Sequence, residues 1–296
     1  MNKIATNLWY DKEAVEDAEF YVNTFEDTKI LNKFTLHNTP SNNDGDVELV
    51  ELKLMDAEFS MISAGPIFKF TPTVSFLIAC DSPSAVNELY AKLAVDGTPL
   101  MEIGEYPFSQ RYGWIQDKYG VSWQIMDMGE RGVKQKVTPT IMYVGDVAGK
   151  AEEAVHFYAE IFKNSSVEEP MRYGKGEEPD EEGTIKHVEF VLEGQRFAAM
   201  DSAHEHKFKF NEAISFVINC DTQEENDYYW DKLSSSKDDE QCGWMKDKFG
   251  LSWQINPTFL SKMLQDPDRK KVDNVTQALL KMKKLVFKDL IDAFES

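Results

Sequence analysis

A histidine and a glutamate two positions apart, His187 and Glu189, are the residues whose types and spacing best fit metal chemistry. Side chains at i and i+2 of a strand point to the same face, so both could reach one ion. A divalent ion held there would polarise a substrate oxygen. Catalytic zinc sites usually use three protein ligands, and the matching positions of the first half are Leu49 and Glu51, so only the acid recurs. Two interpretations stay open, a divalent metal site and a hydrogen-bonded polar pair.

Nucleophilic chemistry finds less support in the sequence. Ser122 and Ser252 occupy equivalent positions of a repeat, but neither lies in a Gly-x-Ser-x-Gly turn and no recurring histidine accompanies them. The cysteines, Cys80, Cys220 and Cys242, are odd in number and show no Cys-x-x-Cys spacing. We therefore expect reduced thiols that take part in packing, without a disulfide or a thiolate zinc site.

A stretch of thirteen residues is present twice. Residues 113–125 read Gly-Trp-Ile-Gln-Asp-Lys-Tyr-Gly-Val-Ser-Trp-Gln-Ile, and residues 243–255 match them at nine positions. Each copy predicts two strands joined by a four-residue turn, in which Asp117 or Asp247 bonds the turn backbone and the glycine takes a positive φ. The alternation that follows predicts that the indoles of Trp123 and Trp253 fill a barrel.

The same stretch contributes to a predicted ligand pocket with apolar walls and few polar groups. The candidate ligand-binding residues come from both halves of the chain, and they are Trp9, Tyr10, Glu51, Trp114, Gln124, His187, Glu189, Trp244 and Gln254.

The elements that must position these residues follow one order in both halves. Apolar alternation and helical periodicity predict strand, helix and three strands, twice in each half. After residue 260 the second half continues into a helical tail, where Val272, Val275, Leu279, Met282 and Val286 form an apolar stripe. We expect this tail to pack across a domain, bridging the two halves or forming an oligomer contact.

Composition excludes several classes of partner. The chain has 296 residues and a formal net charge of -20, which repels nucleic-acid backbones and anionic membranes. No run of about eighteen apolar residues predicts a membrane span, and the first residues lack the apolar core of a signal peptide. We expect a cytoplasmic protein that binds neither nucleic acid nor membrane.

Residues 243–255, with Asn-Pro-Thr at 256–258, Asp-Pro-Asp at 266–268 and Leu-Lys-Met-Lys-Lys at 280–284, closely resemble PhnB-like proteins. These belong to the vicinal oxygen chelate superfamily, with glyoxalase I, bleomycin-resistance proteins and dioxygenases. Some members have been labelled demethylubiquinone methyltransferases. The sequence shows no Gly-rich loop of the kind that a nucleotide-type cofactor needs between strand and helix.

The resemblance implies an α+β fold of four βαβββ modules, which form two half-barrel domains around cavities. Four modules in one chain would reproduce, covalently, a dimer of the usual two-module subunit. The predicted boundaries are a first domain at 1–128, a linker at 129–136, a second domain at 137–260 and a C-terminal helical extension at 261–296.

The metal ligands of the metal-dependent relatives do not transfer to this chain. The resemblance places them on the first and last strands of the barrel, as His, Gln and Glu. The corresponding first strands offer Asn7, Trp9 and Tyr10 in one half and no histidine in either, and the last strands lack the usual glutamate.

Three functions follow from these observations. The leading hypothesis is a metal-independent protein without a cofactor, a monomer or homodimer, that binds a small apolar or aromatic molecule in the barrel cavity, with catalysis left open. The second is a metal-dependent lyase or dioxygenase of the glyoxalase type that uses His187 and Glu189. The third is a drug-sequestering protein similar to bleomycin-resistance proteins.

Overall fold

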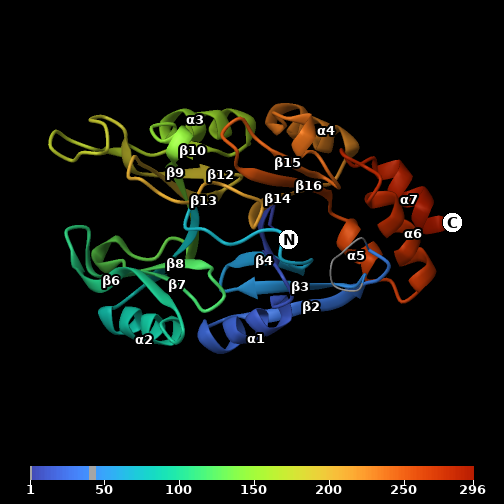
Figure 1. The fold of residues 1–296 in the computed structure, drawn as a ribbon, viewed down its shortest axis with the longest axis horizontal. Coiled ribbons are helices and arrows are strands. Elements are labelled where there is room, and N and C mark those ends of the chain that lie inside the picture. The colour runs from blue at the N-terminus through green and yellow to red at the C-terminus, as the bar shows by residue number, and fades with distance from the viewer. Residues whose placement is uncertain (1, 40–44) are drawn as a thin grey trace.

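The computed structural model describes residues 2–39 and 45–296, and it contains four modules of one strand, one helix and further strands (Figure 1). The first half comprises β1 (Ile4–Tyr10), α1 (Ala14–Thr24), β2 (Lys29–Leu36), β3 (Val47–Leu54) and β4 (Ala57–Ser63), then β5 (Val74–Cys80), α2 (Pro83–Leu93), β6 (Thr98–Tyr106), β7 (Ser109–Gln116) and β8 (Ser122–Asp127).

The second half repeats the plan with different connections. It comprises β9 (Val137–Val144), α3 (Ala151–Ile161), β10 (Ser166–Val167), β11 (Met171–Arg172), β12 (Ile185–Leu192) and β13 (Gln195–Ser202), then β14 (Ile214–Cys220), α4 (Gln223–Leu233), β15 (Trp244–Lys246) and β16 (Ser252–Pro257). Three short 3-10 turns lie at Gly129–Arg131, Gly145–Val147 and Lys237–Asp239. The α+β class and the four-module plan are confirmed.

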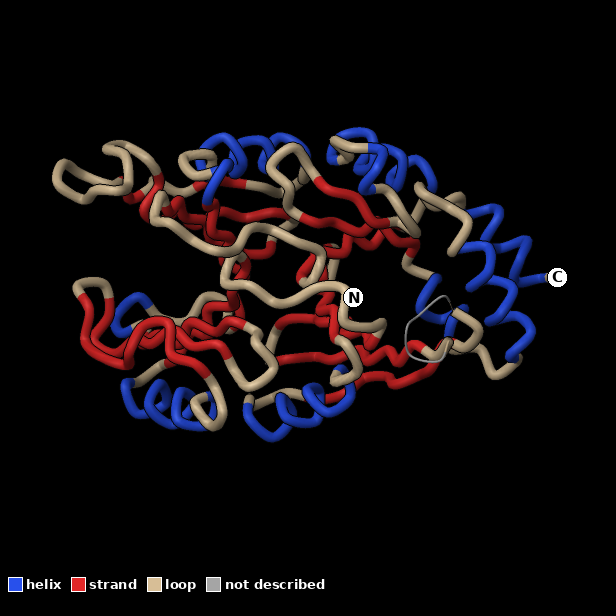
Figure 2. The backbone as a smooth tube through the Cα atoms, in the orientation of Figure 1, coloured by secondary structure: helices blue, strands red, loops and turns tan. Residues whose placement is uncertain are grey.

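Each of the two sheets combines one module from each half. The seven-stranded sheet, called here the first cup, has the order β15-β16-β14-β1-β4-β3-β2, and β1 and β14 pair antiparallel at the junction. The nine-stranded sheet, called the second cup, runs β10-β12-β13-β9-β5-β8-β7-β6, with β11 pairing β12 off this path and with β5 and β9 pairing antiparallel at the junction. Helices α1 to α4 lie outside the strands, and the strands of both halves face one another across the middle (Figure 2).

The apolar core of each half lies between its helices and the strands. Trp123 contacts Tyr21, Phe25 and Phe76 there, with ring centroids 4.7 to 5.3 Å apart. Trp253 contacts Tyr158 and Phe162 in the second half in the same way. The prediction that these indoles fill a barrel is therefore wrong, because they point to the helix side of the sheets and not to the concave side.

The C-terminal tail forms three helices, α5 (Leu260–Leu264), α6 (Arg269–Leu279) and α7 (Phe287–Glu295), beside the first cup (Figure 1). The predicted stripe does not continue as one helix. Buried side chains of the tail pack against Leu36 and Val47 of the first module. The backbone N–H groups of Cys242 and Gly243 donate to carbonyls of Met282 and Lys283. The tail thus bridges the two halves.

Candidate functional site

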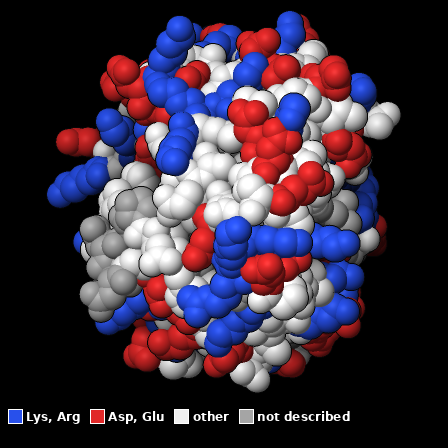
Figure 3. Space-filling model, turned by 90° about the vertical axis from the view of Figure 1, so that its right-hand side faces the viewer, with Lys and Arg blue, Asp and Glu red and all other residues white. Residues whose placement is uncertain are grey.

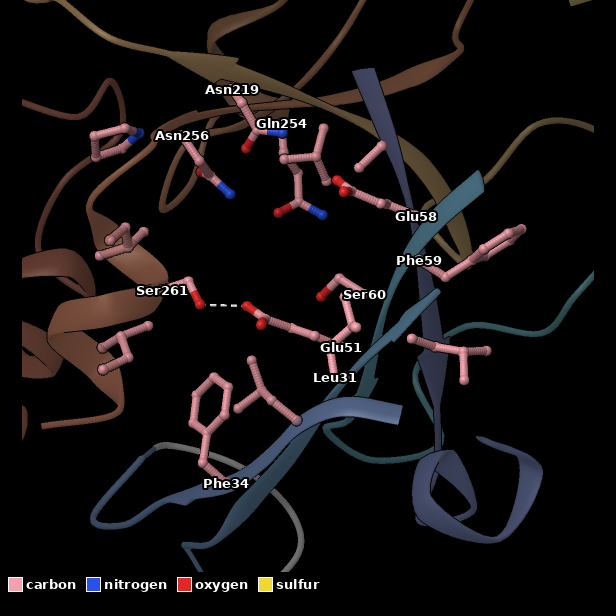
Figure 4. Close-up of a pocket in the computed structure, with 17 residues that line it drawn as sticks. Leu31, Phe34, Glu51, Glu58, Phe59, Ser60, Asn219, Gln254, Asn256 and Ser261 are labelled. Carbon is pink, nitrogen blue, oxygen red and sulfur yellow. Dashed lines mark hydrogen bonds between the residues drawn. The ribbon is translucent and has the colours of Figure 1, made fainter. Parts of the chain in front are cut away.

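A cavity of about 360 Å³ lies on the concave face of the first cup (Figure 4). Its volume is within the range of about 300–1,000 Å³ typical of small-molecule sites. Strands from both halves and helix α5 form its walls. The lining residues are Ala5, Leu31, Phe34, Leu49, Glu51, Leu52, Glu58, Phe59, Ser60, Val217, Asn219, Gln254, Asn256, Pro257, Leu260, Ser261 and Leu264.

Strand alternation selects which side chains reach this face. In β3, Val50 is fully buried on the helix side, so its neighbour Glu51 faces the concave side. Glu51 pairs in register with Ser60 of β4, which lies beside it in the lining. In β16, Trp253 is buried in the helix-side core and Gln254 points into the cavity.

The carboxylate of Glu51 is bound from two sides. The Ser261 hydroxyl, at the start of α5, donates to Glu51 Oε1, and the Asn32 amide donates to Oε2. Leu260 and Leu264 of the same helix line the cavity. Helix α5 therefore supplies both apolar wall and a hydrogen-bond donor to the acid.

Two amides on neighbouring strands leave their oxygens open. Asn219 Nδ2 donates to the backbone carbonyl of Asn2 at 2.8 Å, and Gln254 Nε2 donates to Ser215 Oγ at 3.0 Å. A carbonyl can only accept, so the orientation of the Asn219 amide is fixed. Within residues 2–39 and 45–296, neither Asn219 Oδ1 nor Gln254 Oε1 accepts a hydrogen bond, although both side chains are only 7% exposed.

Of the predicted ligand-binding residues, the structure brings Glu51 and Gln254 together in this cavity. Trp9 and Trp244 lie on β1 and β15 of the first cup but do not line the cavity; their ring centroids are 5.9 Å apart, and Trp9 Nε1 donates to the carbonyl of Gly65. Tyr10 does not face the cavity: it is buried on the helix side, where its hydroxyl donates to Asp17.

The other predicted residues lie in the second cup and not beside Glu51; they are Trp114, Gln124, His187 and Glu189. Trp114 Nε1 donates to Ser122 Oγ at 2.7 Å. Gln124 donates to Ser75 Oγ, as Gln254 does to Ser215, but its Oε1 accepts from the Tyr112 hydroxyl at 2.8 Å. The residue corresponding to Tyr112 in the first cup is Cys242. The second cup thus satisfies an acceptor that the first cup leaves open.

His187 and Glu189 lie on β12 of the second cup, but their surroundings do not fit a metal. The Arg196 guanidinium forms ion pairs with Glu189 at 2.6 Å and with Glu168 at 2.9 Å. Burial lowers the pKa of His187. No group of three or more His, Cys, Asp or Glu side chains in the described part of the chain is placed to hold a metal ion. This pair offers two possible metal ligands, and one of them, Glu189, already forms an ion pair with Arg196.

The thiols are not placed for nucleophilic chemistry. Cys80, Cys220 and Cys242 are free, and burial raises the pKa of both Cys80 and Cys220 to about 12. A thiol with so high a pKa holds almost no thiolate near neutrality. Packing therefore accounts for the two buried cysteines.

Two buried carboxyl groups of the first half, Asp17 and Asp117, have perturbed pKa values but lie outside any cavity. Burial raises the pKa of both, and Asp117 raises that of Asp17 further. They accept from Tyr10 and Tyr21 in the core between α1 and the strands, where Asp17 is fully buried. The second half has Ala154 at the position of Asp17. We conclude that this cluster is structural.

Asp17→Ala tests that conclusion. A carboxyl whose pKa is higher in the folded than in the unfolded state favours folding while protonated, and this contribution is lost as pH rises through the folded pKa. The variant should therefore be more stable than the parent by about 1 kcal/mol or more at pH 8, and the difference should shrink towards pH 4.5. Urea unfolding at three pH values measures it. Glu19→Ala, exposed on the same helix, is the control, and an Asp17→Ala variant with the parent's pH slope would contradict the assignment.

Five polar cavity residues were not predicted, namely Glu58, Ser60, Asn219, Asn256 and Ser261. Asn219 and Asn256 could have been found, because each lies an even number of residues from a concave-face position of its strand. Ser261 carried no such signal, because its contact with Glu51 spans 210 positions of sequence.

No helix in the described residues is long and apolar enough to span a membrane. Among curated proteins, none matches the chain. Among solved structures, a PhnB protein from Bacillus cereus is similar at 34% identity over 43% of this chain and 99% of its own, with a TM-score of 0.39. Glyoxalase I from Zea mays is similar at 11% identity over 90% of this chain and 98% of its own, with a TM-score of 0.52, which is a likeness of fold.

The family model described as 3-demethylubiquinone-9 3-methyltransferase matches residues 2–126 and again residues 135–256. The two matches span most of the chain and correspond to its two halves. The chain therefore belongs to this family, as a tandem PhnB-like protein.

Proposed function

We propose that this protein binds a small molecule with an apolar or aromatic body in the cavity of the first cup, without a metal ion. The cavity itself carries the proposal: about 360 Å³, mostly apolar walls, and a few polar groups on two strands and one helix. Such a combination is what small-molecule sites generally show. We assign binding to the cavity and no reaction.

Metal independence is supported by the contacts of the two candidate ligands. Glu189 is neutralised by Arg196, and His187 has no third partner of ligand type beside it among the residues described. Elemental analysis of purified protein tests this part. A stoichiometric divalent ion that disappears in His187→Ala would overturn it and restore the glyoxalase-type alternative.

A neutral fluorescent arylamine, N-phenyl-1-naphthylamine, is a suitable probe of the cavity, because its emission rises in apolar surroundings. Leu49→Trp should weaken its binding at least about tenfold, because the indole fills space that the leucine leaves open. Fluorescence titration gives the dissociation constant.

His187→Trp is the matched control, because residue 187 occupies in the second cup the position that Leu49 occupies in the first. The control variant should bind the probe as the parent does. Equal binding by the parent and by Leu49→Trp would show that the probe does not occupy the first cup.

A further inference from the structure

The polar groups of the first cup include acceptors on three side chains, beside the amide of Asn256 and the hydroxyl of Ser60. Glu51 contributes a carboxylate, and Gln254 and Asn219 contribute amide oxygens that receive no hydrogen bond in the described part of the chain. In Figure 4 the Gln254 side chain points into the cavity, towards Glu51. A ligand that satisfies these atoms must bring hydrogen-bond donors.

The charge of the lining has one sign. It contains Glu51 and Glu58, whose Oε2 accepts from the backbone N–H of Asn2, and none of its residues is Lys, Arg or His. Over the outer face that carries the C-terminal helices, basic and acidic side chains are interspersed (Figure 3). We therefore expect the lining, and not that outer face, to determine which ligand charge the cavity prefers.

In the second cup, the glutamate that corresponds to Glu51 is Glu189, and an ion pair with Arg196 neutralises it. Glu51 pairs with Ser60 across β3 and β4, and Glu189 pairs with Ala198 across β12 and β13. This register makes Arg196 the counterpart of Glu58. The second cup thus pairs its glutamate with an internal guanidinium at 2.6 Å, whereas the first cup has a second carboxylate where that cation would be.

We propose that the first cup is selective for an organic ammonium with an apolar body. The ammonium donates to Glu51 in place of the Ser261 hydroxyl and to the open oxygens of Gln254 and Asn219, and the body contacts Leu49 and Leu264. Hydrogen bonds between charged partners are stronger than neutral ones, so cation, neutral and anion analogues of one shape should bind in that order. The proposal rests on the proposed function, since it requires the same cavity.

The test uses three ligands that share an indole: tryptamine as the cation, tryptophol as the neutral analogue and indole-3-propionate as the anion. Each displaces N-phenyl-1-naphthylamine from the full-length protein at pH 7.5. Tryptamine should bind at least about tenfold more tightly than tryptophol, and indole-3-propionate more weakly than both. Equal affinities of tryptamine and tryptophol in a protein that binds the probe would overturn the ammonium proposal and leave the proposed function intact.

Glu51→Gln locates the selectivity. The variant should lose the preference for tryptamine over tryptophol, measured as the ratio of their two dissociation constants in the same protein. Glu189→Gln is the matched control and should keep the preference. A preference retained in Glu51→Gln would overturn the role of this carboxylate, and a parent protein that does not bind the probe would overturn both proposals.

Discussion

Asp247→Ala is expected to destabilise the protein by about 3–5 kcal/mol, because several buried donors lose their acceptor and each unsatisfied donor costs about 1–3 kcal/mol. One oxygen of Asp247 accepts from the backbone N–H groups of Phe249 and Leu251, at 2.9 and 3.1 Å. The other accepts from Trp253 Nε1 at 2.9 Å and from the Tyr158 hydroxyl at 2.7 Å. The side chain is 2% exposed, so water cannot replace it.

Removing the carboxylate leaves four buried donors without a partner, which is more costly than losing the bonds alone. Urea unfolding followed by tryptophan fluorescence measures the change. Lys248→Ala is the control, because this neighbour is 44% exposed and its contacts, an ion pair with Glu153 and the faces of the Phe157 and Phe249 rings, lie at the surface. A loss below about 1 kcal/mol in Asp247→Ala would show that the turn and the helix contact do not depend on this residue.

Val275→Asp is expected to release the tail from the first cup. Val275 is fully buried in the cluster that joins α6 and α7 to Leu36 and Val47. An unpaired carboxylate in such a cluster costs about 3 kcal/mol or more. Because α5 forms one wall of the cavity, release of the tail should also weaken binding of N-phenyl-1-naphthylamine.

Limited trypsin digestion and probe titration together test this expectation. The variant should be cut rapidly in α6, which begins Arg-Lys-Lys at 269–271, while the remainder of the chain resists cleavage. Gln277→Asp places the same new charge on an exposed position of the same helix and should behave as the parent. Equal resistance of Val275→Asp and Gln277→Asp would mean that the tail is held by other contacts.

The repeated stretch shows what local sequence could predict and where it failed. The hairpin with its aspartate and positive-φ glycine follows from turn chemistry, and Gly120 and Gly250 have φ values of 92° and 86°. Alternation correctly places Trp253 and Gln254 on opposite faces of one strand. It does not say which face meets the helices, since both faces of these sheets are covered, and the indoles were therefore assigned to the wrong side.

The candidate site was predictable only in part, because it is built from residues far apart in the chain. The correspondence between the two halves predicts Glu51 and Gln254, and the antiparallel pairing of β1 with β14 brings their strands into one sheet. No local sequence pattern predicts this pairing or the difference in charge between Glu58 and Arg196. The predicted domain boundaries stay a prediction, although the sheets draw on both sides of them.

The sharing of each sheet between the halves has a consequence for how the two cups can change over time. In a symmetric homodimer both interfaces carry the same residues, so any substitution in one cup appears in the other. Here both halves lie on one chain, which replaces dimer affinity by an effective concentration of about millimolar. Dilution cannot part the halves, and each cup can acquire its own residues. This independence allows the first cup to carry a carboxylate, Glu58, where the second cup carries a guanidinium, Arg196.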